Sequence, residues 1–167
     1  MTEIHVRPAE RADLPRLTEV YNYFVVNTPV TFDVEPYTVE RRGAWFEQFA
    51  LTGRYRLVVA EEYGVVVGYA GTTRFRVKPA YDTTVETTIY CSHETIGKGV
   101  GGRLYAALFE AIAAHDVHCI VAGATMPNDA SKALHLRCGF REVGVFSSVG
   151  FKLEKYWDVA WFQKTLA

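Results

Sequence analysis

The chain has 167 residues, 49% of them hydrophobic and 22% charged, and its 18 Lys and Arg residues oppose 19 Asp and Glu residues for a net charge of −1. This profile is typical of one soluble globular domain, and the charge balance argues against the basic surfaces that nucleic acids and membrane surfaces require. No apolar run approaches the roughly 18 residues of a membrane span, and residues 1–8 lack the apolar core of a signal peptide. We therefore expect a single domain over residues 1–167, located in the cytoplasm.

The three cysteines are Cys91, Cys119 and Cys138, and they lie far apart in the sequence. They form no CxxC pair and have no histidine beside them at ligand spacing. Neither a zinc site nor a disulfide framework is indicated, so we expect no metal.

The predicted elements begin with a short strand, because Ile4 and Val6 alternate with polar residues. A helix follows, with apolar residues at helical spacing from Leu14 to Phe24 and with Asp13 as its expected N-cap. Residues 27–37 contain two prolines and are predicted to form a loop.

Thr38 is expected to cap a second helix that turns three aromatic residues inward, namely Trp45, Phe46 and Phe49. Residues 57–60 and 65–73 are apolar runs separated by a turn over residues 61–64, which predicts a hairpin of two strands.

A basic segment follows, in which Arg74, Arg76 and Lys78 alternate with other residues up to Pro79. Residues 83–91 are rich in β-branched side chains, which predicts a strand. The glycine-rich residues 97–102 come next, and the apolar-rich residues 104–114 are predicted to form a helix.

The last predicted elements are a strand over 119–124, a helix over 130–137 and two strands near 141–150 and 156–165. Gly139 is expected to stop the preceding helix at its C′ position. The order is therefore β α α β β β α β α β β. Because the helices interleave with a mostly antiparallel first half, a single mixed sheet is favoured over a doubly wound parallel one.

The glycine-rich segment is Gly97-Lys98-Gly99-Val100-Gly101-Gly102. Between a strand and a helix, such glycines let backbone N–H groups approach an anion, and the helix N-terminus adds partial positive charge. The segment predicts a phosphate cradle, and the alternative is a flexible turn. It also matches GxGxxG, but no acidic residue stands about twenty positions on, between His118 and Val121, so a dinucleotide site is disfavoured.

Further segments from about residue 4 to residue 166 match those of a known family in the same order. They include Gly68-Tyr69-Ala70, Thr83 to Tyr90 (TTVETTIY), the glycine-rich loop, Pro127 to Ser131, Leu134-His135 and Gly139-Phe140. On these segments the chain resembles the GNAT superfamily of N-acetyltransferases, and more narrowly the phosphinothricin and methionine sulfone/sulfoximine acetyltransferases.

This resemblance implies an α/β fold of the α+β type, with a single mixed, mostly antiparallel sheet flanked by helices. It implies acetyl-CoA as the donor and a small-molecule primary amine as the acceptor, with direct transfer in a ternary complex. It also implies a homodimer, because the family is commonly dimeric. Neither nucleic acid nor a membrane is expected as a partner.

The resemblance places the coenzyme against the backbone of the predicted strand, the glycine-rich loop and the start of the next helix. The cofactor-binding residues that it implies are Ile89, Tyr90, Cys91, Gly97, Lys98, Gly99, Val100, Gly101, Gly102, Arg103, Asn128 and Ser131. Asn128 can also be interpreted as a helix cap, and both roles are compatible.

Two residues are implied to be catalytic. Glu86 is the candidate base, since a lone carboxylate in a partly dry cleft has a raised pKa that suits proton acceptance. The alternative is a strand residue paired to a cross-strand cation such as Arg74. His135 is a candidate donor to the leaving thiolate or to the acceptor, and the alternative is a packed helix histidine.

The implied acceptor pocket contains Phe32, Arg76, Val77, Lys78, Tyr81, Glu86, Thr87 and Thr88. Cations at Arg76 and Lys78 suit the carboxylate of an amino acid, and the alternative is a solvated basic strand end. The same two cations argue against a polyamine acceptor. A non-catalytic coenzyme-binding module is disfavoured because Glu86, Asn128 and His135 occur together.

The chain departs from the family pattern in two places. Ile96 stands where the family has Gln or Arg at the start of the glycine-rich loop, and we expect binding to persist because the cradle is mostly backbone. Residues 152–156 replace the pattern Lys-x-Gly-x-Trp in a loop that covers the acceptor site, which leaves the acceptor's identity open.

Overall fold

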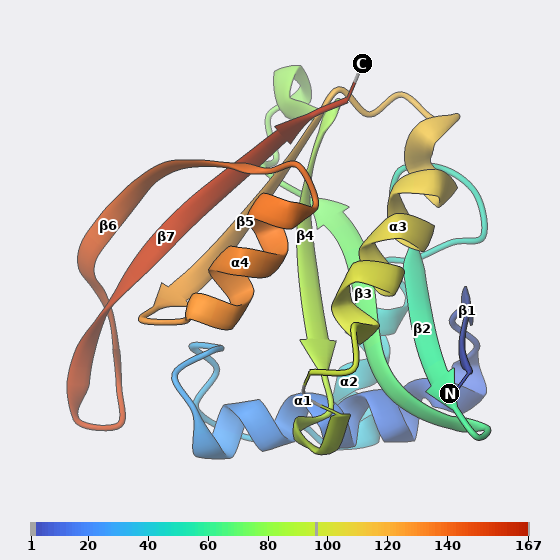
Figure 1. The fold of residues 1–167 in the computed structure, drawn as a ribbon, viewed down its shortest axis with the longest axis horizontal. Helices are drawn as coiled ribbons and strands as arrows, with labels where there is room; N and C mark the ends of the chain where they lie inside the picture. The colour runs from blue at the N-terminus through green and yellow to red at the C-terminus, as the bar shows by residue number, and fades with distance from the viewer. Residues whose placement is uncertain (1–2, 96, 167) are drawn as a thin grey trace.

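The computed structural model describes residues 3–95 and 97–166, so the departure at Ile96 lies outside the described residues (Figure 1). The strands are β1 (Ile4–Pro8), β2 (Leu57–Glu62), β3 (Val65–Arg74), β4 (Thr84–Cys91), β5 (Cys119–Met126), β6 (Arg141–Lys152) and β7 (Lys155–Thr165). The α-helices are α1 (Leu14–Asn27), α2 (Val39–Phe46), α3 (Val100–Ala113) and α4 (Asp129–Arg137). This order confirms the predicted one.

All seven of these strands belong to one sheet in the order β1-β2-β3-β4-β5-β7-β6. Each neighbouring pair is antiparallel except β4 and β5, which run parallel. The predicted mixed, mostly antiparallel sheet is thereby confirmed.

The parallel pairing of β4 with β5 is short. It joins Thr84 to Cys119, Val85 to Ile120 and Glu86 to Val121, and both strands then continue without each other, to Cys91 and Met126. Figure 1 shows the two arrows adjacent at their starts and apart at their tips. Beyond Glu86, backbone groups on the facing edges of both strands therefore have no strand partner.

Helices cover both faces of the sheet, and each face has its own hydrophobic cluster. One cluster joins α3 to the sheet through residues such as Leu104 and Val85, and the other joins α1 through residues such as Leu17 and Tyr69. Because side chains alternate along a strand, neighbouring residues of β2 enter different clusters. None of the helices in the described ranges has the length and hydrophobicity needed to cross a membrane.

The basic segment lies outside the sheet, because β3 ends at Arg74, one residue beyond its predicted end, and a loop follows. The Arg74 guanidinium donates to the carbonyls of Arg76 and Val77 and pairs with Asp82, which curls the segment into a loop. Pro79, which has no N–H to donate, begins a 3₁₀ turn there. Arg76 and Lys78 are therefore not alternate residues of one strand.

The starts of α1 and α2 differ in whether the N-cap side chain is free to accept a hydrogen bond from the helix. The Thr38 hydroxyl accepts a hydrogen bond from the Arg41 N–H at 3.2 Å, which confirms the predicted cap. Asp13 stands at the N-cap position of α1 without capping it, because its carboxylate accepts from Arg7 and from the Glu10 N–H.

Candidate active site

The glycine-rich loop leads into α3 through backbone conformations that favour glycine. Gly97 has a φ of +85°, and Gly99, the N-cap of α3, has a φ of +75°. Among the described residues, and apart from the chain neighbours and the helix's own backbone, no heavy atom lies within 4 Å of the positions where a Cβ would stand at Gly97, Gly99 or Gly102. Backbone N–H groups at the start of a 14-residue helix are thus open to a ligand, which suits an anion.

The cations near this loop are occupied within the protein. The Lys98 ammonium lies 3.0 Å from a carboxylate oxygen of the buried Glu62, and Arg103 donates to the Ile4 carbonyl at 3.1 Å. The backbone is therefore the main source of attraction for an anion. Val100 lies in the core, and a Cβ at Gly101 would lie 2.9 Å from Leu134 Cδ2, so these two positions serve helix packing.

A narrow cleft opens where β4 and β5 separate, and we call it the seam cleft. Its lining comes from β4, β5 and α4, with one residue each from α3 and the loop after α1. The lining residues are Val30, Thr87, Thr88, Ile89, Tyr90, Tyr105, Gly123, Ala124, Asn128, Ser131 and His135. The unpaired backbone of β4 and the small residues of β5 suit an extended ligand with amide groups.

Asn128 and Ser131 stand at the α4 side of the seam cleft. The Asn128 side-chain oxygen accepts from the Ser131 N–H at 3.1 Å, so Asn128 is the N-cap of α4. The cap interpretation is confirmed, and both residues still border the seam cleft.

His135 lies at the base of the seam cleft and is only 3% exposed. Its Nδ1 is 2.7 Å from the Ser131 carbonyl oxygen, and its Nε2 is 2.9 Å from the Tyr105 hydroxyl. Because a carbonyl only accepts, Nδ1 carries the hydrogen and Nε2 accepts from Tyr105. Burial lowers the pKa of His135, which keeps the ring neutral. This geometry favours the packed-histidine alternative.

Tyr105 is a cleft residue that sequence reasoning missed. It is fully buried on α3, and burial raises its pKa, so the hydroxyl keeps its proton and donates to His135. In the sequence it falls within an apolar helical run and looks like any other core aromatic residue.

Glu86 stands at the last register pair between β4 and β5, opposite Val121. Burial raises the pKa of its carboxyl, and the positive charge of Arg76 opposes that rise. Arg74, the predicted alternative partner, lies opposite Val85 and pairs with Asp82. No ion pair within the described ranges includes Glu86, so its carboxylate is available for a ligand.

A wider cavity of about 510 Å³ includes Val121, the register partner of Glu86, in its lining, and we call it the aromatic pocket. Its lining comes from the 75–81 loop and from β4, β5, β6 and β7. The lining residues are Phe75, Arg76, Tyr81, Thr84, Cys119, Val121, Val143, Gly144, Val145, Phe146, Trp161, Phe162 and Gln163. The Arg76 guanidinium lies 4.9 Å from the centre of the Phe75 ring and 5.8 Å from that of Tyr81.

The predicted acceptor residues are not all brought together. Arg76 and Tyr81 line the aromatic pocket, whereas Thr87 and Thr88 line the seam cleft. Val77 and Lys78 are exposed and line neither, because the loop after β3 turns them outward. Phe32 packs against Gly150 of β6, where its ring occupies the space that a Cβ would need.

The β6–β7 hairpin is fixed over the loop that follows α1. Lys152 is buried at the end of β6, and its ammonium donates to the Thr31 carbonyl at 2.7 Å. Burial lowers the pKa of Lys152, and the nearby Asp33 opposes that shift. Together with the contact between Phe32 and Gly150, this holds the hairpin beside the candidate site.

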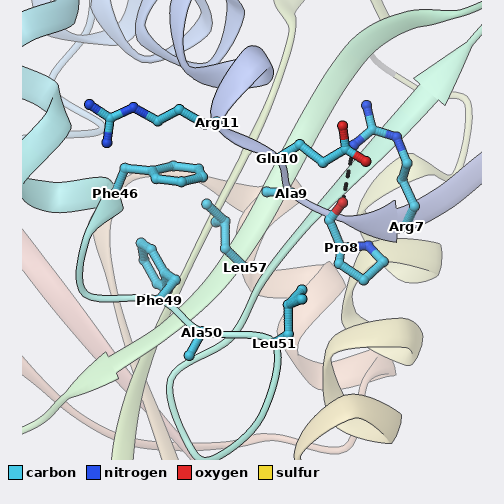
Figure 2. A pocket seen from close by; sticks show the side chains of 10 residues that line it. All are labelled: Arg7, Pro8, Ala9, Glu10, Arg11, Phe46, Phe49, Ala50, Leu51 and Leu57. Atoms are coloured by element: carbon cyan, nitrogen blue, oxygen red, sulfur yellow. Dashed lines mark hydrogen bonds between the residues drawn. The ribbon is translucent and has the colours of Figure 1, made fainter.

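Another cavity, of about 550 Å³, lies near β1, three strands from β4 (Figure 2). Its lining residues are Arg7, Pro8, Ala9, Glu10, Arg11, Phe46, Phe49, Ala50, Leu51 and Leu57. The Arg7 guanidinium is engaged there by Asp13, Glu61 and the Pro8 carbonyl. This cavity contains none of the predicted site residues.

The described residues contain no group of three or more His, Cys, Asp or Glu side chains that could hold a metal ion. Cys91 and Cys138 pack against the hydrophobic cluster on the α3 face, and Cys119 is buried.

Comparisons with known proteins find relatives over nearly the whole chain. Residues 17–140 match the model of the Acetyltransferase (GNAT) family. The chain is 48% identical to a phosphinothricin N-acetyltransferase of Streptomyces coelicolor, over 98% of this chain and 97% of that protein. It is 35% identical to an L-methionine sulfoximine/L-methionine sulfone acetyltransferase of Pseudomonas aeruginosa, over 96% of this chain and 94% of that protein.

The fold is also that of solved relatives. A phosphinothricin acetyltransferase from Sinorhizobium meliloti, solved in complex with acetyl-CoA, superposes with a TM-score of 0.91 at 35% identity, covering 100% of this chain and 90% of that one. An N-acetyltransferase from Staphylococcus aureus superposes with a TM-score of 0.91 at 32% identity, covering 99% of this chain and all of that one. The chain therefore belongs to the GNAT family of acetyltransferases.

Proposed function

We propose that this chain transfers the acetyl group of acetyl-CoA to the primary amine of a small amino-acid-like acceptor, in the class of methionine sulfone, methionine sulfoximine and phosphinothricin. The observation that carries the proposal is the place of Glu86 on β4, between Thr84, which lines the aromatic pocket, and Thr87, which lines the seam cleft. Donor and acceptor would meet at an available carboxylate. The names of the relatives, at 48% and 35% identity, support this substrate class.

The residues of the seam cleft and the glycine-rich loop fit the donor. The backbone of Ile89, Tyr90 and Cys91 pairs with the pantetheine arm along the unpaired edge of β4. The N–H groups of residues 97–102 bind the pyrophosphate, with Arg103 beside them. Asn128 and Ser131 border the pantetheine from α4. When bound, acetyl-CoA supplies an acetyl group activated as a thioester.

The acceptor amine must lose a proton before it can react, since an α-amino group with a pKa of roughly 8 is mostly protonated at pH 7. Glu86 takes this proton, directly or through a water molecule. Arg76 binds the carboxylate of the acceptor by a charge-assisted hydrogen bond. His135 and Tyr105 act as positioning residues that shape the base of the seam cleft.

The proposed protein is one acetyltransferase domain over residues 1–167, located in the cytoplasm and assembled as a homodimer. Exposed apolar side chains on the β6–β7 hairpin support the dimer, because such a patch is typical of an interface. These side chains are Val149, Phe151, Leu153 and Tyr156. Light scattering after size-exclusion chromatography tests the dimer, and a monomer at all concentrations would contradict it.

The experiment that tests the function is a thiol-release assay with acetyl-CoA and a panel of amines. The panel contains methionine sulfone, methionine sulfoximine, phosphinothricin, common amino acids and polyamines. We expect turnover with amino acids. Binding of acetyl-CoA without turnover on any amine would favour a non-catalytic module, and a preference for polyamines would overturn the acceptor class.

A further inference from the structure

We infer that the aromatic pocket receives the side chain of the acceptor, and that the preferred acceptors are α-amino acids with large, uncharged, apolar side chains. Phenylalanine, tryptophan and methionine represent this class, and phosphinothricin, whose side chain carries a second anionic group, is expected to be the weakest acceptor among those named above. The inference rests on the proposed function and specifies its acceptor.

The position of the pocket relative to Glu86 supports the assignment. Thr84 lines the pocket and stands two residues before Glu86 on β4, so the two side chains share a face of the sheet. Val121, the register partner of Glu86, lines the pocket as well. An acceptor whose amine contacts Glu86 and whose carboxylate contacts Arg76 therefore extends its side chain into this cavity.

The lining of the pocket determines which side chain fits. Rings of Phe75, Tyr81, Phe146 and Trp161 and several valine side chains surround about 510 Å³. A cavity of this size lies within the range of small-molecule sites and has room for an aromatic ring. Apolar walls favour apolar groups because burial removes both surfaces from water.

The charge of the pocket sets the second part of the preference. Arg76 is the charged residue among those that line it, and Lys78 does not line it. One guanidinium matches the one carboxylate that every α-amino acid carries. A second anion in the side chain, such as a phosphinate, would lie against apolar walls while Arg76 is engaged by the α-carboxylate, which is unfavourable.

The test compares acceptors on the wild-type protein by kcat/KM at saturating acetyl-CoA. We expect phenylalanine, tryptophan or methionine to exceed phosphinothricin by at least about tenfold, with methionine sulfone in between. Turnover of amino acids with phosphinothricin preferred would overturn this inference and leave the proposed function standing. Absence of turnover on every amino acid would overturn both.

A matched pair of variants locates the side-chain site. Val143→Trp fills the pocket from β6, where Val143 is 55% exposed, and Val65→Trp adds the same bulk on β3, where Val65 is 52% exposed and lines neither cavity. We expect V143W to lower the ratio of kcat/KM for tryptophan to that for alanine by at least about tenfold, and V65W to leave it unchanged. Because the ratio is taken within each variant, loss of folded protein cancels. An unchanged ratio in V143W would overturn the inference.

Discussion

Along β4, Glu86 stands between Thr84 of the aromatic pocket and Thr87 of the seam cleft, and the two cavities have different kinds of lining. The cleft is bordered by the unpaired backbone of β4 and by Gly123 and Ala124 of β5, whereas large side chains from five segments enclose the pocket. Backbone carbonyls are the same for every residue type, so substitutions along β4 leave these groups in place. The pocket changes with each of its side chains. Proteins of one family can therefore share a donor and differ in acceptor.

The largest effect on activity is expected at Glu86. Glu86→Gln keeps the shape of the side chain but removes the base, and general-base assistance is worth roughly 10²–10⁴-fold. We expect kcat to fall by that factor at pH 7, with partial recovery at high pH, where free amine is abundant. Profiles of kcat/KM against pH measure this. If the two profiles superimpose at equal height, Glu86 is a structural strand residue.

On the pocket side, Arg76→Ala should raise the acceptor KM by about 10–100-fold, because a hydrogen bond to a charged group contributes about 1.5–3 kcal/mol. The KM for acetyl-CoA should not change. The Arg76 charge lowers the pKa of Glu86, and activity needs the ionised carboxylate. The acidic limb of the pH profile should therefore move to higher pH.

Lys78→Ala removes the same charge from an exposed loop position and is the control for Arg76→Ala. Equal effects of the two variants would mean that the net charge of the loop, rather than the pocket, attracts the acceptor.

On the cleft side, Gly102→Glu places a negative charge beside the anion site. Gly102 is the best position because Gly99 has a positive φ and a side chain at Gly101 would meet Leu134. We expect binding of acetyl-CoA to weaken at least tenfold, or about 1.4 kcal/mol, in calorimetry. Gly102→Gln, which adds the same length without charge, should bind more tightly than Gly102→Glu. Equal affinities of the two variants for acetyl-CoA would contradict the assignment of this loop as the phosphate-binding site.

The smallest expected effect is a loss of stability at the base of the seam cleft. Tyr105→Phe leaves Nε2 of His135 buried without its donor, and an unsatisfied buried acceptor costs about 1–3 kcal/mol. The free energy of unfolding in urea should fall by that amount with an unchanged slope. Tyr156→Phe, at an exposed tyrosine, is the control. An unaltered midpoint in Tyr105→Phe would mean that water replaces the lost hydroxyl.

The order of the elements was predictable because each has an apolar pattern of its own period. The ends of elements were less so. The helix predicted from residue 104 begins at Val100, since Gly101 and Gly102 have low helix propensity and conceal its first turn. Arg74 ends β3 through side-chain hydrogen bonds to its own loop, which no periodicity reveals.

The two cavities also differed in how far they could be predicted from the sequence. The glycine-rich loop is one short segment, and Asn128 directly precedes the helix that it caps, so both features could be predicted from the sequence. The aromatic pocket gathers residues as distant as Phe75 and Trp161, whose types are equally typical of a core. The point where β4 and β5 separate depends on how the two strands diverge in space. The sequence of neither strand shows where their pairing ends.

The short pairing of β4 with β5 also affects how firmly the two parts of the sheet are joined. The backbone of the sheet is joined across this boundary at three register positions, from Thr84 to Glu86, and the core cluster beneath α3 spans the same boundary. A ligand that bridges the seam cleft binds only when both halves are in place. At 100 times its dissociation constant it would disfavour their separation by about 2.7 kcal/mol. Bound donor would then connect β4 and β5 where they lack each other as partners, and each release of product would weaken the fold at this boundary.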